Sequence, residues 1–217
     1  MPDVALDADV LVKCSAYGLL QQATACLICG DGNAALLGST KYTVLARLKR
    51  ATLEQSPIVA ESRFLAFLQS ASLLEPTSEE GELAADLEFE AQKMALALDA
   101  GESQLAAIVI VRAIPLLVTG DKRAIRALEA LVEIVPAPSA LISKIACLEQ
   151  LFITLLGTGD TTAIRDAVCS ERHVDKSASI CFACHSSQAN VGDWLDALNS
   201  YVAALRADAP KVLMSDF

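Results

Sequence analysis

Short apolar runs and longer segments with helical spacing follow one another along the first part of the chain. Apolar runs bounded by turn residues predict buried strands, whereas apolar residues that recur every three or four positions predict helices. Strands are predicted at residues 4–13, 34–37, 116–119 and 133–135. Helices are predicted at residues 17–29, 40–53, 56–74, 77–98, 102–112 and 122–131. This alternation implies an α/β fold, with a parallel sheet flanked by helices.

The pattern changes at residues 136–138, where the sequence reads Pro-Ala-Pro. From residue 139 onward the spacing of apolar residues is helical, and no further strand is predicted. Helices are predicted at residues 139–156, 161–169 and 191–206. We therefore expect an α/β domain over residues 1–137, followed by an all-helical C-terminal extension over residues 138–217.

Three acidic residues lie where separate segments of such a fold would converge. Asp7 ends an apolar run, Glu102 begins a helix, and Asp121 follows a strand-like run. Because residues just past the carboxyl ends of parallel strands share one crevice, we expect these carboxylates to lie together. Carboxylate oxygens suit Mg²⁺ or Mn²⁺, which bridge to phosphate, and Asp9 and Asp99 are candidate additional ligands. The alternative is that all of them are solvated surface charges, since 27 of 217 residues are Asp or Glu.

The sequence around these acids resembles a known family. Residues 6–13, which begin Leu-Asp-Ala-Asp, are similar to the opening strand and acid of PIN-domain nucleases, the fold of the VapC-type toxins. Residues 98–108 resemble the family's third acidic segment, and residues 118–124 resemble its last acidic turn. The three segments occur in the family's order, and the resemblance covers residues 1–137.

The resemblance implies a PIN-like fold and a metal-dependent ribonuclease that hydrolyses phosphodiester bonds. Asp7, Glu102 and Asp121 would then be the catalytic residues, and they would hold Mg²⁺ or Mn²⁺. The family also implies RNA as the substrate, an antitoxin-like protein as a partner and a homodimer as the assembly.

Two further hypotheses arise from the same residues. The family places a Glu on the helix after the second strand, where this chain has Ala46 or Arg47. Its place would have to be taken by Glu54, Glu61 or Asp9. The second hypothesis is therefore a catalytically degenerate PIN-like protein with a binding or regulatory role. The third is a different metal-dependent phosphohydrolase, because Asp7 and Asp9 form an Asp-x-Asp pair.

Charge limits the kind of nucleic-acid surface that the protein can carry. A net charge of −10 opposes a large, non-specific surface, because phosphate binding depends mainly on Lys and Arg. The basic residues are grouped, however, into Lys41, Arg47, Lys49 and Arg50, and into Lys122, Arg123 and Arg126. Both groups would flank the acidic crevice, so we expect RNA contacts from Lys41, Arg47, Lys122 and Arg123. The alternative is that they lie on solvated helix faces.

Both histidines of the chain lie among three cysteines in the predicted extension. The order is Cys169, His173, Cys181, Cys184 and His185. The first four could form a tetrahedral zinc site that stabilises the extension. The alternative is a buried helix turn in which the cysteines act as small apolar residues. The last three also match a haem attachment pattern, which would require export from the cytoplasm.

Cysteine usage and hydropathy also bear on the compartment. The N-terminus, which reads Met-Pro-Asp, has no basic segment ahead of a hydrophobic one, so a signal peptide is not expected. Seven cysteines in such a chain predict reduced thiols in the cytoplasm and no disulfides. No apolar stretch reaches 18 residues without a charged side chain, so no membrane span is expected either.

Overall fold

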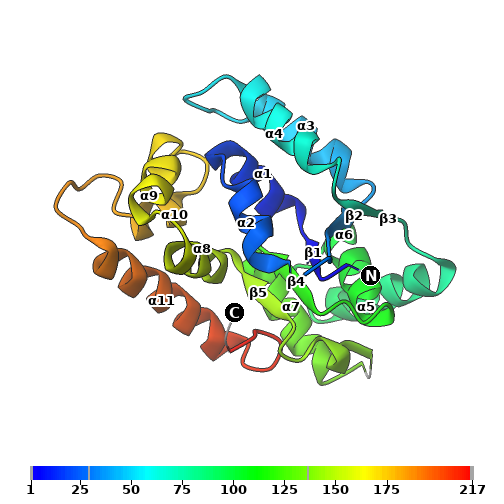
Figure 1. Cartoon of the computed structure of the whole chain (residues 1–217). Coiled ribbons are helices and arrows are strands. Elements are labelled where there is room, and N and C mark those ends of the chain that lie inside the picture. Colours follow the sequence, from blue (N-terminus) through cyan, green and yellow to red (C-terminus); the bar gives the residue numbers. More distant parts are fainter. Residues whose placement is uncertain (1, 29, 136, 216–217) are drawn as a thin grey trace.

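A computed structural model describes residues 2–28, 30–135 and 137–215 of the chain. Five parallel strands form one sheet in the order β3-β2-β1-β4-β5 (Figure 1). The strands are β1 (Val4–Leu6), β2 (Ala34–Leu37), β3 (Ser72–Leu74), β4 (Leu116–Thr119) and β5 (Ile145–Cys147). The predicted α/β class with a parallel sheet is therefore confirmed. Cys29, at the end of a predicted helix, and Pro136, at the predicted domain edge, lie outside the described residues.

Helices cover both faces of the sheet. Those on the β1 to β3 connections are α1 (Ala8–Tyr17), α2 (Leu20–Leu27), α3 (Thr40–Arg50) and α4 (Pro57–Phe67). The next three are α5 (Ser78–Lys93), α6 (Ala100–Val111) and α7 (Lys122–Val132), and the 3-10 helix η1 spans Ala137–Leu141. The last four are α8 (Leu148–Thr158), α9 (Thr161–Ser170), α10 (Lys176–Cys181) and α11 (Val191–Asp208). In the described part of the chain, no helix is long and apolar enough to cross a membrane.

The alternation of side chains along the strands divides the core in two. In β1, Val4 and Leu6 pack into one hydrophobic cluster, and Ala5 packs into the other. Successive residues of a strand point to opposite faces, so the sheet separates the two clusters. The first cluster contains residues of α1 to α4 and α8 to α10, and the second contains residues of α5 to α7. Helix α11 contributes to both, through Leu198 to the first and Leu205 to the second.

The segment after residue 138 takes part in both the sheet and the core. The expectation that it is all helical is wrong, because β5 lies within it and pairs with β4. The strand predicted at 133–135 does not form, since these residues make the turn that follows α7. Phe152 and Phe182, both fully buried, pack in the same cluster as Val10 of α1.

The first predicted strand is shorter than the pattern of residues 4–13 suggested. Asp7 ends it, because its carboxylate accepts hydrogen bonds from the backbone N–H groups of Ala8 (2.6 Å) and Asp9 (3.4 Å) and so caps α1. Asp9 therefore lies on a helix rather than on a strand. Helix α1 ends at Gly18, whose positive φ of 73° suits glycine.

The prediction that the chain has no disulfide is wrong. Cys169, near the end of α9, is bonded to Cys184, which follows α10. The bond closes a short loop, because the two residues are 15 positions apart. Among the described residues, Cys14, Cys26, Cys147 and Cys181 are free thiols.

One edge of the sheet is covered by the C-terminal part of the chain. The backbone N–H of Ile145 in β5 donates to the carbonyl of Val212 (3.0 Å), and the N–H of Met214 donates to the carbonyl of Ile145 (2.9 Å). Leu213 thus forms an isolated parallel bridge to Ile145. The other edge of the sheet is β3, with Leu73 half-exposed.

Candidate functional site

A pocket of about 700 Å³ lies at the carboxyl ends of β1 and β4. These strands are neighbours at the point where the strand order reverses, and ligands of open α/β sheets bind at such a switch point. Five acidic residues line the pocket: Asp7, Asp9, Asp99, Glu102 and Asp121. All five carboxylates proposed from the sequence as metal ligands thus line one pocket, and they come from three separate segments, at the starts of α1, α6 and α7.

Asp7 is held by the end of the neighbouring strand. The hydroxyl of Thr119, the last residue of β4, donates to Asp7 Oδ2 (3.1 Å) and accepts from the backbone N–H of Asp121 (3.1 Å). Burial raises the pKa of the Asp7 carboxyl, and the nearby charge of Asp9 raises it further. Thr119 therefore fixes the spacing between Asp7 and Asp121, which with Glu102 are the three central acids of the pocket. The sequence pattern did not reveal this role.

Asp99 and Glu102 form a capping box at the start of α6. The carboxylate of Asp99 accepts from the backbone N–H groups of Gly101 and Glu102 (both 2.9 Å), and the carboxylate of Glu102 accepts from the N–H of Asp99 (2.9 Å). Burial raises the pKa of Glu102 to about 7, and the charges of Asp99, Asp121 and Asp7 act in the same direction. Glu102 is thus crowded by other carboxylates.

Asp121 caps α7 and is also paired with a cation. Its carboxylate accepts from the backbone N–H of Arg123 (2.8 Å), and the Arg123 guanidinium lies 2.6 Å from Asp121 Oδ2. Burial alone would raise the pKa of Asp121, but the hydrogen bonds and charge of Arg123 outweigh it and the pKa is lowered. Asp121 is therefore the central acid that ionises most readily.

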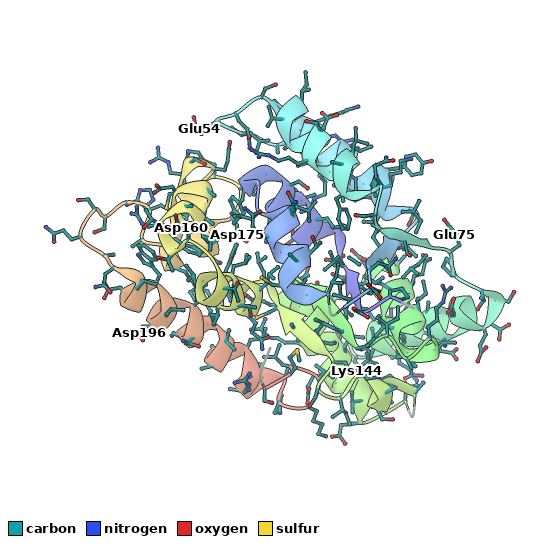
Figure 2. All side chains as sticks on the ribbon, in the orientation of Figure 1. Glu54, Glu75, Lys144, Asp160, Asp175 and Asp196 are labelled. Carbon is teal, nitrogen blue, oxygen red and sulfur yellow. A yellow bond between two sulfur atoms is a disulfide. The ribbon has the colours of Figure 1, made fainter. Side chains whose placement is uncertain are left out.

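Asp9 belongs to a second network of charged groups at the pocket. Lys13 Nζ lies 2.5 Å from Asp9 Oδ2 and 2.5 Å from Asp175 Oδ2, and Arg47 Nη2 lies 2.8 Å from Asp9 Oδ1. Asp175, labelled in Figure 2, caps α10, so the C-terminal segment reaches the wall of the pocket. A Cβ on Gly120 would overlap Asp9 Oδ2, so a larger residue at this position would displace the Asp9 carboxylate from the network. Lys13 and Asp175 were missed in the sequence, because pairs so far apart leave no local pattern.

The acids act as helix caps and ion-pair partners in this arrangement. Among the described residues, no three His, Cys, Asp or Glu side chains are grouped so that they could hold a metal ion as they stand. Asp7, Asp99 and Asp121 accept from backbone N–H groups at the starts of α1, α6 and α7. Metal binding would therefore compete with the hydrogen bonds that the carboxylates of Asp7, Glu102 and Asp121 accept from backbone N–H groups.

The predicted RNA contacts divide into two pairs. Arg47 and Arg123 line the pocket. Lys122 instead pairs with the buried carboxylate of Glu149 (2.5 Å) and lies over the ring of Tyr201 at 4.6 Å. Lys41 lies over the ring of its neighbour Tyr42, at 5.9 Å, and is not among the residues that line the pocket. The sequence did not reveal this difference, because Lys122 and Arg123 are adjacent but lie on different sides of one helix.

The four residues proposed as zinc ligands are not arranged as a tetrahedral site. Cys169 and Cys184 are joined to each other. Cys181 is buried in the first hydrophobic cluster, as the alternative interpretation expected for these cysteines. His173 is exposed, with Nε2 3.7 Å from Glu54 Oε1. A zinc site on these residues stays a prediction, and it requires the disulfide to be reduced.

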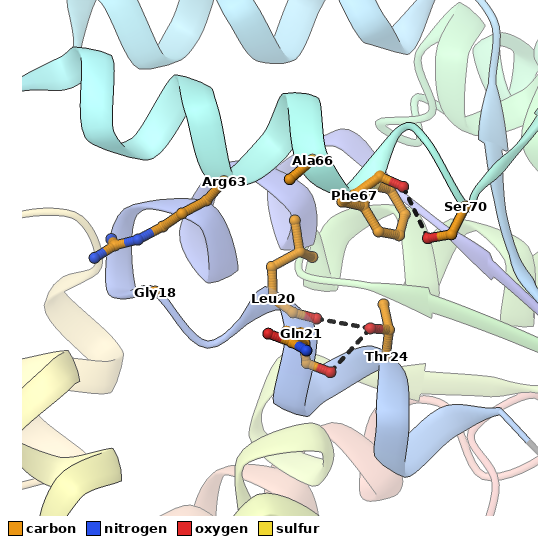
Figure 3. Close-up of a pocket in the computed structure, with 8 residues that line it drawn as sticks. All are labelled: Gly18, Leu20, Gln21, Thr24, Arg63, Ala66, Phe67 and Ser70. Atoms are coloured by element: carbon orange, nitrogen blue, oxygen red, sulfur yellow. Dashed lines mark hydrogen bonds between the residues drawn. The ribbon is translucent and has the colours of Figure 1, made fainter.

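A second hollow, of about 450 Å³, lies between α2 and α4 (Figure 3). Arg63 extends along it and donates to the carbonyls of Ser15 and Ala16 at the end of α1 (both 3.2 Å). Its walls carry Leu20, Phe67 and polar groups, and no carboxylate of the described residues lines it. Arg63 thus serves mainly to satisfy a helix C-terminus.

The raised pKa of Glu102 predicts how stability depends on pH. The folded protein keeps a proton on Glu102 up to about pH 7, whereas the unfolded chain releases it near the ordinary value of 4.5. Stability from this group is therefore lost as the pH rises between these values. Glu102→Gln, which mimics the protonated form, should raise the melting temperature at pH 8 by roughly 2–4 °C (about 1 kcal/mol), a modest effect because the group is partly screened by solvent. Differential scanning calorimetry at pH 5 and pH 8 measures this.

At pH 5 the Glu102→Gln variant and the parent protein should melt together. Glu82→Gln, on the exposed face of α5, is the matched control and should leave both melting temperatures unchanged. If the melting temperatures of the parent and of Glu102→Gln change in parallel between pH 5 and pH 8, the charged form of Glu102 is not disfavoured by its surroundings.

Comparisons with known proteins identify no relative. No family model matches the chain, and neither a curated protein nor a solved structure matches it. Any function must therefore be inferred from the chain's own side chains and from how the fold arranges them.

Proposed function

We propose that the pocket at the ends of β1 and β4 binds Mg²⁺ or Mn²⁺, and that the protein hydrolyses RNA phosphodiester bonds as a PIN-type ribonuclease does. The observation that carries the proposal is the meeting of Asp7, Glu102 and Asp121 in one pocket at the switch point of the sheet. They come from the ends of two parallel strands and the start of one helix, in the order that the resemblance to the family requires.

The charges around the pocket suit a divalent cation. Five carboxylates line it with three cations, Lys13, Arg47 and Arg123. Two of the carboxylates, those of Asp7 and Glu102, have raised pKa values, first through burial and then through their acidic neighbours. Buried carboxylates without enough positive charge favour proton or metal binding. Oxygen ligands of this kind select Mg²⁺ or Mn²⁺ rather than a softer metal.

Each residue has a role in the proposed reaction. Asp7, Glu102 and Asp121 would hold the metal, and Thr119 would keep Asp7 oriented through the hydrogen bond to Oδ2. The bound ion would supply an activated water and stabilise the charge on the leaving oxygen. Arg123, which is exposed apart from its contact with Asp121, would exchange that carboxylate for an RNA phosphate.

A PIN-like protein that binds without cutting is the second candidate function. The contacts of Asp9 favour it, since both its oxygens already face cations, from Lys13 and Arg47. Arg47 is also one of the two residues that stand where the family has a Glu. A cation is therefore found where a fourth acid was expected. In this alternative the charge of the pocket is balanced from within, and no metal is needed.

Manganese binding separates the two candidates. At a free Mn²⁺ concentration of roughly 100 times its dissociation constant, binding to the folded state adds about 2.7 kcal/mol, which should raise the melting temperature by roughly 5–10 °C. Asp7→Asn should remove this shift while preserving the helix cap, because Asn caps as well as Asp. Isothermal titration of Mn²⁺ at pH 7.5 into the parent and the variant gives the affinities directly.

Asp160→Asn is the matched control for this experiment. Asp160 caps α9 through hydrogen bonds to two backbone N–H groups, as Asp7 caps α1, but it does not line the acidic pocket. Its variant should keep the full response to Mn²⁺. No response in the parent protein would exclude the metal-dependent nuclease and leave the binding protein as the better hypothesis.

A further inference from the structure

A third hollow, of about 330 Å³, opens beside the acidic pocket. It is lined by the end of α3, the turn that follows, and the segment before α10. Among the described residues, its basic side chains are Arg47, Arg50 and His173, and no acidic residue lines it. Arg47 also lines the acidic pocket, so the two hollows meet at this side chain. A basic surface thus continues directly from the proposed metal site.

Helix α3 concentrates positive charge in an acidic protein. The chain has 27 acidic and 17 basic residues, yet the 11 residues of α3 include four Lys or Arg and no Asp or Glu. Three of the four, Arg47, Lys49 and Arg50, fall in its last turn. Arg50 is exposed and forms no ion pair within the described part of the chain. Its guanidinium is therefore free to bind an external anion.

The turn between α3 and α4 is held in shape by a buried acid. The carboxylate of Glu171 accepts hydrogen bonds from the backbone N–H groups of Glu54 (2.8 Å) and Gln55 (2.9 Å). Glu171 is only 3% exposed, so it fixes the turn without presenting its own charge to solvent. The exposed carboxylate beside His173 is that of Glu54, 3.7 Å from Nε2, and a bound phosphate would take its place. The backbone of the turn beside the basic hollow is thus held in place before an anion binds.

We infer that this basic hollow binds the phosphate backbone of an RNA strand next to the bond that lies in the acidic pocket. Arg50 and His173 would contact one phosphate, and Arg47 would lie between that phosphate and the metal site. The inference names residues for substrate binding and rests on the proposed function. It also changes the set of residues expected to contact RNA. Arg50 and His173 now belong to this set, whereas Lys41 and Lys122, which line neither hollow, do not.

RNA binding without metal tests this inference separately from catalysis. Fluorescence anisotropy of a labelled single-stranded RNA in EDTA, at about 100 mM salt, should show roughly 5- to 10-fold weaker binding for Arg50→Ala, since each phosphate contact contributes on the order of 1 kcal/mol. The slope of log affinity against log salt should fall by about 0.7, the value for one phosphate of a single strand. His173→Ala should weaken binding in the same direction.

Lys49→Ala is the matched control, because Lys49 precedes Arg50 on the exposed surface of α3 but does not line the hollow. It should change neither the affinity nor the salt slope. Equal effects of Lys49→Ala and Arg50→Ala would overturn the inference, and so would tight RNA binding that is unaffected by Arg50→Ala. Displacement by poly-glutamate at equal charge, with the same dependence on Arg50, would mean an acidic peptide ligand instead.

The outcomes also separate this inference from the proposed function. RNA binding that depends on Arg50 in a protein that does not bind Mn²⁺ would reject the nuclease and keep the RNA surface. Mn²⁺ binding that depends on Asp7, without any RNA binding in EDTA, would keep the metal site and reject the RNA surface.

Discussion

Asp121→Asn should reduce Mn²⁺-dependent cleavage of single-stranded RNA by about 100-fold or more. The carboxylate of Asp121 is one of three proposed metal ligands, and an amide oxygen is a weaker ligand for a hard cation. The fold should be preserved, because Asn can accept the same backbone hydrogen bonds at the start of α7. Cleavage of a fluorescent oligonucleotide, measured with and without Mn²⁺, gives the ratio, and circular dichroism shows whether melting stays cooperative.

The control for this variant is again Asp160→Asn, which alters a helix cap outside the pocket and should cleave at the parental rate. Cleavage that continues in EDTA, or that is equal in parent and Asp121→Asn, would argue for a contaminating nuclease or a mechanism that does not use this pocket. Loss of cleavage in both variants would point to a general effect of altered helix caps.

Phe152→Ala should lower the free energy of unfolding by about 3–5 kcal/mol, the usual cost of removing a buried aromatic ring. Phe152 in α8 is fully buried. Its ring centroid lies 5.2 Å from that of Phe182 after α10, and 6.1 Å from that of Tyr17 in α1. The substitution therefore opens a cavity between the N-terminal helices and the C-terminal segment. Urea unfolding followed by fluorescence of the single Trp194 and by circular dichroism measures the loss.

Ile180→Ala is the corresponding control, because Ile180 lies in the same region but is 52% exposed. It should change the unfolding free energy by no more than about 0.5 kcal/mol. A loss of less than about 1 kcal/mol in Phe152→Ala would contradict the packing of its ring between Tyr17 and Phe182. Two separate transitions in the parent would mean that the segment after residue 138 unfolds separately from the rest of the chain.

The sequence pattern correctly located the strands that are apolar runs and that end at a clear turn signal. Strands β2 and β4 begin and end at the predicted residues, since each is an apolar run followed by a glycine that breaks it. The three-residue strands β3 and β5 were missed, because Ser72–Leu74 and Ile145–Cys147 are too short to show a period. Residues 133–135 have the composition of a strand, but they form the turn that ends α7.

The functional site could also be predicted only in part. The acids at strand ends could be predicted to meet, because the carboxyl ends of parallel strands lie together at one end of the sheet. The ion-pair partners of charged residues around the site could not be predicted. Lys13 with Asp175, and Lys122 with Glu149, are joined by folding over long sequence separations. The pairing of Cys169 with Cys184 is of the same kind, since the spacing of cysteines does not define their connectivity.

The bridge between Leu213 and Ile145 has a consequence for the newly made chain. A strand at the edge of a sheet exposes unpaired N–H and C=O groups that can recruit a strand from another molecule. Chains emerge from the ribosome N-terminus first, so β5 is available to pair with β4 before residues 212–214 have been synthesised. During that interval both edges of the sheet are open to wrong partners. Docking of residues 212–214 closes the β5 edge, so a chain that lacks these residues presents one more open edge to wrong partners.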